Sequence, residues 1–231
     1  MDIWSDVACP WCYIGKTRLE AALREFEHRD EVEIRYHSFE LDPDAPTSGP
    51  GEHGQLLAAK YGLSPAEAQQ ALDRVRSVAA GDGLELRFDL ARSGPTFDAH
   101  RLLHLAAARG VQAAVKERLM RAHFSEGADV ADHDTLVRLG REAGLDEAEL
   151  RTVLGSSAYA DDVRADEAQA RQLGISGVPF FVVDGKYGVS GAQPVEVFAQ
   201  LLARVWSERP PVTVVSGPDQ GEACALDGGA C

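Results

Sequence analysis

The sequence predicts an α/β fold that is interrupted by a long all-helical segment. Residues 2–7 alternate in polarity, and apolar or small residues then recur with a helical period over 12–26. A second strand is predicted from Val32, where apolar and polar side chains alternate through His37, and it is expected to end at Asp42-Pro43. Because a helical crossover between two strands favours their parallel pairing, the chain is predicted to open with a parallel β-α-β unit.

The long middle of the chain, from about residue 51 to 174, has helical periodicity. Thr96 and Gly110 bracket one predicted helix, and Ser64-Pro65 and Leu145-Asp146 are typical of further helix starts. Residues 84–88 give a weak extended signal. Strand character returns at 180–183, followed by the turn signal Asp184-Gly185, a strand over 187–189 and an amphipathic helix over 194–206.

A chain of 231 residues fits one core with an insertion as well as two full domains. We divide it into a first core part, a helical insertion, a second core part and a tail, at 1–45, 46–165, 166–210 and 211–231. The tail is rich in Gly, Asp and Ser, so we expect it to fray.

The net charge of −14, without a basic cluster, argues against nucleic acid and anionic membranes as partners. The first residues do not have the pattern of a signal peptide, and no run of 18 or more residues is continuously apolar. We therefore expect a cytoplasmic protein, unless a leader has been removed. In a reducing compartment, a close cysteine pair is more often catalytic or metal-binding than structural.

The most informative motif is Cys9-Pro10-Trp11-Cys12, at the predicted start of a helix that follows a strand. The unpaired N–H groups and the helix dipole there favour a thiolate, so we expect a lowered pKa for Cys9. Pro10 suits the first helical position because its missing N–H would be unpaired there anyway. Cys12, one turn on, can resolve a mixed disulfide on Cys9, and Trp11 offers an apolar contact to a substrate.

Two other uses of the cysteines remain open. A Cys-X-X-Cys pair is also half of a tetrahedral zinc site, although the gap between Cys224 and Cys231 is wide for the second half. The two tail cysteines could instead form a second dithiol that passes electrons to Cys9 and Cys12, or be incidental exposed thiols.

Several stretches resemble the DsbA family of thioredoxin-like oxidoreductases, specifically its FrnE-like branch. They are residues 5–16 around the cysteine pair, Phe39-Glu40-Leu41-Asp42-Pro43, Thr96 with Ala99-His100-Arg101-Leu102, and the loop 174–181 with Val178-Pro179. The resemblance extends over about residues 1–208. It implies a thioredoxin-like fold with an inserted all-helical domain, in which a cis Pro179 packs against the cysteine pair. Backbone groups of Val178 would then pair with an extended substrate.

The same superfamily includes kappa-class glutathione transferases and hydroxychromene-carboxylate isomerases, which typically have Ser at the position of Cys9. The leading hypothesis is therefore a DsbA-like protein disulfide oxidoreductase or isomerase, and a glutathione-dependent transferase or isomerase is the alternative. We expect no metal and no tightly bound cofactor, with glutathione as a candidate redox partner. Partners would be protein or peptide disulfides and small-molecule thiols, and the protein would be a monomer or homodimer.

Other polar residues near these motifs have two interpretations each. Asp6 either raises a thiol pKa and accepts a proton, or accepts backbone N–H bonds in a turn. His100 and His104 share a helix face at a metal-compatible spacing, but packing or cleft-lining roles are favoured. His37 is predicted to be a partly exposed strand residue rather than a modulator of Cys9, and Lys16 a surface charge.

Overall fold

The computed structural model describes residues 1–49 and 51–209, so the predicted tail with Cys224 and Cys231 lies outside the described residues. In chain order the elements are β1 (Asp2–Ser5), α1 (Pro10–Glu25), the short 3-10 helix η1 (Arg29–Glu31), β2 (Arg35–Ser38), α2 (His53–Tyr61), α3 (Pro65–Gly81), α4 (Phe97–Ala108), α5 (Gln112–Glu126), α6 (His133–Glu142), α7 (Glu147–Leu154), α8 (Ala160–Gln172), β3 (Phe180–Val183), β4 (Tyr187–Ser190) and α9 (Val195–Ser207). None of the described helices is long and apolar enough to cross a membrane.

The sheet has the strand order β2-β1-β3-β4. β1 pairs in parallel with β2, as the β-α-β opening predicts, and in antiparallel fashion with β3. β3 and β4 form the predicted hairpin, in which Asp184 and Gly185 both have positive φ angles. Together with the helices that cover it, this sheet forms a thioredoxin-like fold.

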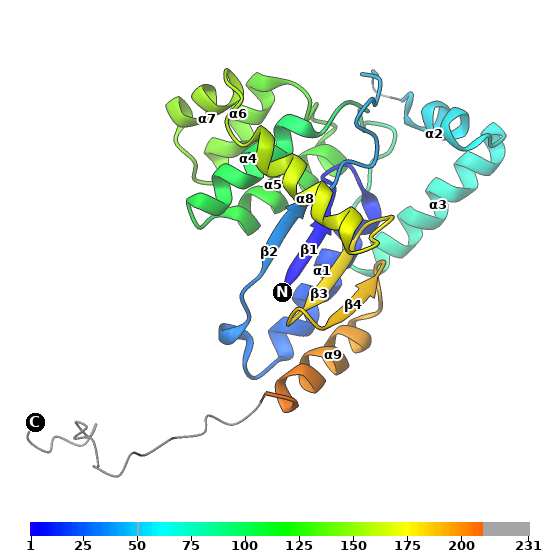
Figure 1. Ribbon diagram of the computed structural model, residues 1–231. Coiled ribbons are helices and arrows are strands. Elements are labelled where there is room, and N and C mark those ends of the chain that lie inside the picture. Colours follow the sequence, from blue (N-terminus) through cyan, green and yellow to red (C-terminus); the bar gives the residue numbers. More distant parts are fainter. Residues whose placement is uncertain (50, 210–231) are drawn as a thin grey trace, which may run out of the picture.

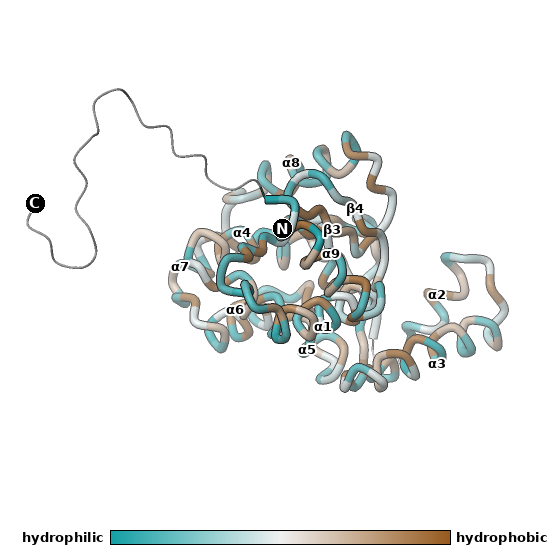
Figure 2. Tube along the Cα trace, turned by 90° about the horizontal axis from the view of Figure 1, so that it is seen from below, coloured by the Kyte–Doolittle hydropathy of each residue, from teal (hydrophilic) through white to brown (hydrophobic). Residues whose placement is uncertain are grey.

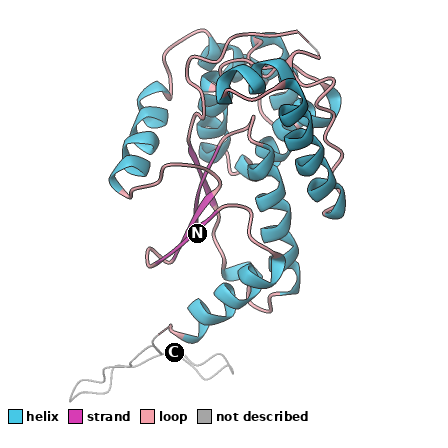
Figure 3. Ribbon diagram, turned by 90° about the vertical axis from the view of Figure 1, so that its right-hand side faces the viewer, coloured by secondary structure: helices cyan, strands magenta, loops and turns pink. Residues whose placement is uncertain are grey.

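Alternating side chains on the strands build a core on each face of the sheet. On one face, Ile3 and Phe181 pack with residues of α1 and α9, such as Leu19 and Phe198. On the other face, Trp4 packs with Ala170 of α8. Figure 1 shows α8 across the front of the sheet, and Figure 3 shows helices on both sides of the strands.

All the helices from α2 to α8 lie between β2 and β3 in the chain, as the helical insertion predicts. α4 to α7 pack around their own apolar core, whereas α2 packs on α3 and α3 packs on α1. Figure 2 shows α2 and α3 as an arm that projects from the rest of the molecule. The last helix of this region, α8, runs beyond residue 165, where we placed the domain boundary.

Local sequence signals explain several helix boundaries. Ser64 and Glu67 form a capping box at the start of α3, and the Asp146 side chain caps α7. The weak extended signal at 84–88 does not give a strand. Leu86 and Phe88 are instead buried in the apolar cluster that contains the cysteine pair. Their alternation therefore reflects side-chain packing, and this segment does not pair with another strand.

Candidate functional site

The cysteine motif lies where β1 ends and α1 begins. Cys9 is the N-cap of α1, and its Sγ accepts a hydrogen bond from Cys12 N at 3.3 Å. Pro10 occupies the first turn as predicted, and that turn carries no acidic residue to oppose a negative charge on sulfur. The backbone N–H of Cys12 thus points at the Cys9 sulfur.

Both cysteines are free thiols, and both are buried: Cys9 is 3% exposed and Cys12 is 2% exposed. The Cys9 sulfur that the substrate must reach is therefore nearly covered in this state. The pair belongs to a buried apolar cluster with residues of α1, α3, α5 and the segment after α3. Partly buried residues from the arm, from the segment that follows it and from the loop before β3 pack against this cluster: Leu57, Val75, Val78, Leu84 and Val178. Trp11, between the two cysteines, is 37% exposed and is the open apolar surface beside the pair.

The loop before β3 reaches the site from the other end of the chain. The Val178–Pro179 peptide bond is cis, and the Val178 carbonyl oxygen lies 3.7 Å from Cys9 Sγ. Gly15, one turn beyond Cys12, allows this approach, because a Cβ atom there would lie 3.0 Å from Cγ of Pro179. Two stretches more than 160 residues apart in the chain therefore meet at Cys9.

The predicted lowering of the Cys9 pKa does not occur in this dithiol state. The pKa of Cys9 is raised, first by its contact with the Cys12 side chain and then by burial, while the Cys12 N–H lowers it and the Asp6 charge raises it further. Two adjacent thiols compete for one stabilised negative charge, so only one of them ionises readily. The helix N-terminus alone therefore does not determine the pKa of Cys9.

Asp6 lies in the loop between β1 and α1 and is buried. Its carboxylate accepts backbone N–H bonds from Ala8 at 3.3 Å and from Leu41 at 2.8 Å. His100 Nε2 of α4 lies 3.4 Å from Asp6 Oδ1. Burial opposes ionisation, but His100, the Leu41 N–H and the Lys116 charge together lower the pKa of Asp6 to about 2. Asp6 is thus a permanent carboxylate that shapes the loop, and a weak proton acceptor at neutral pH.

The remaining predicted polar residues have separate partners. His104 Nε2 contacts Ser38 Oγ at 3.0 Å, away from His100, so the two histidines do not form a metal pair. His37 bridges Asp2 and Asp166 and does not contact Cys9. Lys16 is not a surface charge: its stem is buried and its ammonium pairs with Glu20 and Glu117.

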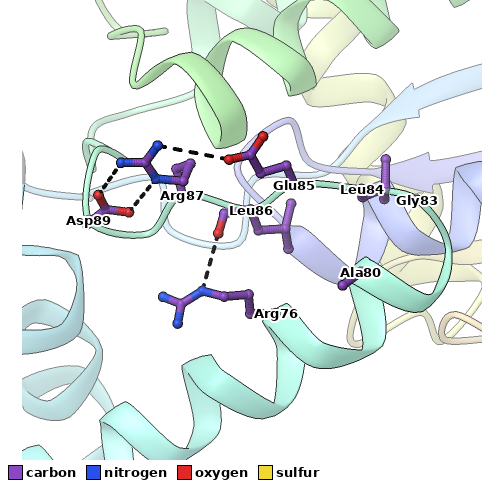
Figure 4. Close-up of a pocket in the computed structure, with 8 residues that line it drawn as sticks. All are labelled: Arg76, Ala80, Gly83, Leu84, Glu85, Leu86, Arg87 and Asp89. Carbon is purple, nitrogen blue, oxygen red and sulfur yellow. Dashed lines mark hydrogen bonds and ion pairs between the residues drawn. The ribbon is translucent and has the colours of Figure 1, made fainter.

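Within the described parts of the chain, no group of three or more His, Cys, Asp and Glu could hold a metal ion. A pocket lies between α3 and the segment 83–89 that follows it (Figure 4). Its lining residues are Arg76, Ala80, Gly83, Leu84, Glu85, Leu86, Arg87 and Asp89. Its two guanidinium groups are engaged within the protein, since Arg76 donates to the Leu86 carbonyl and Arg87 pairs with Asp89.

Sequence reasoning missed one residue of this site, the buried Lys116 of α5. Its Nζ donates to the carbonyl oxygen of Ser5, the last residue of β1, at 3.3 Å. The available signal was its spacing from Met120 and His123, which places all three on one face of the helix.

Comparison with known proteins gives a consistent family. Residues 1–203 match the family described as DSBA-like thioredoxin domain. A crystal structure of a probable DsbA oxidoreductase from Streptomyces coelicolor is 48% identical, with a TM-score of 0.85, and the match covers 97% of this chain and 98% of that one. The protein YwbO of Bacillus subtilis strain 168 is 26% identical over 204 residues, which are 87% of this chain and 94% of the relative.

A more distant structure has the same fold. The cytosolic disulfide reductase DsbM from Pseudomonas aeruginosa, solved with GSH, is 20% identical with a TM-score of 0.63, and the match covers 89% of this chain and 98% of that one. The finer resemblance to the FrnE-like branch stays a prediction.

Proposed function

The chain belongs to the family of DsbA-like thioredoxin domains, and from this premise we propose that it is a thiol-disulfide oxidoreductase whose reacting pair is Cys9 and Cys12. One observation carries the proposal. The Cys9 sulfur lies at the N-terminus of α1, 3.3 Å from Cys12 N and 3.7 Å from the Val178 carbonyl oxygen. A sulfur held between a helix start and an extended backbone segment is placed to exchange with a peptide-bound disulfide.

The exchange has two displacement steps. The Cys9 thiolate attacks a substrate disulfide, so that a mixed disulfide forms on Cys9 and the first substrate sulfur leaves as a thiolate. Cys12 then attacks Cys9 Sγ, and the new Cys9–Cys12 bond releases the second substrate sulfur. Two electrons pass to the substrate, and the two protons lost by the cysteines end on the two substrate thiols. Run backward, the same steps oxidise a substrate dithiol.

Residues around the pair would position the substrate. Trp11 supplies an exposed apolar surface beside the two sulfurs, and Pro10 fixes the backbone of that turn. Val178 would offer backbone groups to an extended substrate, and the ring of Pro179, packed against Gly15, holds that loop on α1. Substrates would be disulfides of proteins or small molecules.

We also propose glutathione as the small-molecule partner and the cytosol as the compartment. The support is DsbM, a cytosolic disulfide reductase solved with GSH, whose fold this chain shares. A glutathione thiolate is small enough to reach a sulfur that is nearly covered, which suits the buried Cys9.

Trapping tests the proposal. In a background with Cys224→Ser and Cys231→Ser, the variant Cys12→Ser should accumulate mixed disulfides on Cys9, visible by mass spectrometry without reductant, because the resolving thiol is gone. Cys9→Ser is the matched control and should trap nothing. Equal labelling of both variants, or glutathione-dependent isomerase activity that survives Cys9→Ser, would reject the dithiol mechanism.

A further inference from the structure

Arg18 of α1 bonds to two parts of the chain that are far apart in the sequence. Its Nε donates to Oδ2 of Asp82, the residue that caps the end of α3, at 2.8 Å. Its Nη1 donates to the carbonyl oxygen of Ala192, in the loop between β4 and α9, at 2.9 Å. The side chains of Arg18 and Asp82 are only 18% and 17% exposed, so solvent screens this ion pair less than a surface pair. A planar guanidinium with two partners is held in one orientation.

The bond to Asp82 fixes the base of the arm. A carboxylate at the C-terminal end of a helix lies at the negative end of the helix dipole, so Asp82 is unfavourable there without a nearby cation. Arg18 supplies that cation from α1. Val75 and Val78, about two turns and one turn before Asp82 on α3, pack against the apolar cluster that contains the cysteine pair. The ion pair therefore sets where these two side chains lie relative to the dithiol.

The bond to Ala192 fixes a loop that lies against the cis peptide bond. The preceding residue, Gly191, donates its N–H to the carbonyl oxygen of Pro179 at 2.8 Å. A Cβ atom on Gly15 would lie 3.0 Å from Cγ of Pro179 and 3.5 Å from Cα of Ala192. Both loops thus rest on the face of α1 that Gly15 shares with Arg18, three residues further on. Contacts of Arg18 therefore connect the arm to the loop that carries the cis proline.

We propose that Arg18 is a positioning residue that couples the arm to the Val178–Pro179 loop, and that this coupling favours extended peptide substrates over small disulfides. The inference rests on the proposed function. A peptide gains from a fixed loop, because its backbone pairs with that of Val178. A small disulfide has no strand to pair, and it meets only the side chains that cover Cys9.

The test compares a peptide probe with a small probe, in a background with Cys224→Ser and Cys231→Ser. The reduced protein reacts in single turnovers with a short peptide whose one cysteine forms a mixed disulfide with thionitrobenzoate, or with hydroxyethyl disulfide. Arg18→Met should raise the peptide concentration at half-maximal rate by about tenfold, as expected for the loss of one charge-assisted hydrogen bond. The rate with hydroxyethyl disulfide should stay the same or rise, because the cover over Cys9 is less firmly held.

Two further variants separate the two bonds. Asp82→Asn removes the charge that holds the arm and keeps the bond to Ala192, so the peptide should lose less affinity than in Arg18→Met. Arg18→Lys keeps the charge without the planar two-partner geometry, and it should recover only part of the peptide affinity. Arg24→Met is the matched control, because it removes the same charge from an exposed position in the last turn of α1. Both probes should react with it as with wild type.

Circular dichroism selects the variants that fold at the assay temperature, and Asp82→Asn and Arg18→Lys keep the test open where Arg18→Met does not fold. A parallel loss of rate with both probes, or an unchanged half-maximal peptide concentration in the Arg18 variants, would overturn the proposal. A general loss of stability would slow both probes alike, whereas the proposed coupling affects the peptide alone. A wild-type protein that reduces neither probe would instead reject the proposed function itself.

Discussion

Gly15 on α1 and Pro179 in the loop before β3 are in such close contact that a Cβ atom on Gly15 would lie 3.0 Å from Cγ of the proline ring. The same Cβ would lie 3.2 Å from Cζ of Phe181. Both neighbours are held by the sheet and by α1, so neither side chain can swing away freely. The absence of a side chain at Gly15 therefore allows the loop to bring Val178 next to Cys9.

Gly15→Ala should destabilise the protein by about 1–3 kcal/mol, because the added methyl group overpacks this contact. Urea unfolding measures the change. Gly81→Ala is the matched control, since it lies at the end of α3 with no atom within 4 Å of the added Cβ. There the change should be small and toward greater stability, by up to about 1 kcal/mol. Equal effects at both glycines would contradict the packing argument.

The pKa of Cys9 should fall when Cys12 is replaced by Ala. The contact with the Cys12 side chain is the largest of the causes that raise the Cys9 pKa, whereas the backbone N–H of residue 12, which lowers it, remains after the substitution. The rate of iodoacetamide alkylation against pH reports this value in a chain without Cys224 and Cys231. An alkylation midpoint that stays the same or rises in Cys12→Ala would show that the thiols do not compete.

His37 should stabilise the protein more in mild acid than in alkali. Burial alone lowers its pKa, but hydrogen bonds to Asp166 at 2.7 Å and to Asp2 at 2.8 Å raise it above 6.5. A raised histidine pKa gives stability that is full below the unfolded value and is lost as pH rises through the folded one. The pKa of Asp166 is lowered, chiefly by His104 and His37 against the effect of burial, so its contribution disappears in strong acid.

The free energy of unfolding lost in His37→Gln should therefore be about 1 kcal/mol larger near pH 6 than near pH 9. Denaturant titrations at the two pH values measure it. His133→Gln removes a solvent-exposed contact with Asp98 and should give a smaller difference. A loss in His37→Gln that is independent of pH would mean that the imidazole acts through packing on Trp4 alone.

Arg101→Met should cost about 3 kcal/mol of stability. Its buried guanidinium donates to the carbonyl oxygens of Val153, Ser156 and Ala158 and pairs with Asp98, so it ties the end of α7 to α4. Removing it leaves these carbonyl groups without their partner. Thermal unfolding compared with Arg121→Met, an exposed arginine on α5, measures the effect. Similar losses in the two variants would contradict this role.

The periodicity of the sequence predicted the elements that have strong local signals. The strand, helix and strand at the start, the capped helices α3 and α7, and the hairpin at Asp184-Gly185 all follow from spacing and capping chemistry. The bounds of β2 were less accurate. The Val32 N–H closes a turn on Arg29, so the ladder begins only at Arg35, and it ends at Ser38 where β1 ends, before Asp42-Pro43.

The burial of charged residues could not be predicted in the same way. Lys16 and Lys116 have the residue type of a solvent-facing helix position, yet carboxylates cover the first and the sheet edge covers the second. Their environment is set by α5 packing against α1 and β2, which is a tertiary property. The raised pKa of Cys9 is likewise not set by the helix start alone, since it depends on the contact with the Cys12 side chain and then on burial.

The arm formed by α2 and α3 has a consequence for how this scaffold can diversify. α2 packs on α3, and α3 packs on α1. α2 touches the rest of the molecule through side chains such as His53, which stacks on Phe88, and Lys60, which pairs with Asp42. Sequence change on the arm leaves both faces of the sheet and the core of α4 to α7 untouched. It alters, however, the side chains of Leu57, Val75 and Val78, which pack against the apolar cluster that contains the cysteine pair. Exchanging the arm between relatives would therefore change the range of substrates, while the chemistry of the cysteine pair stays the same.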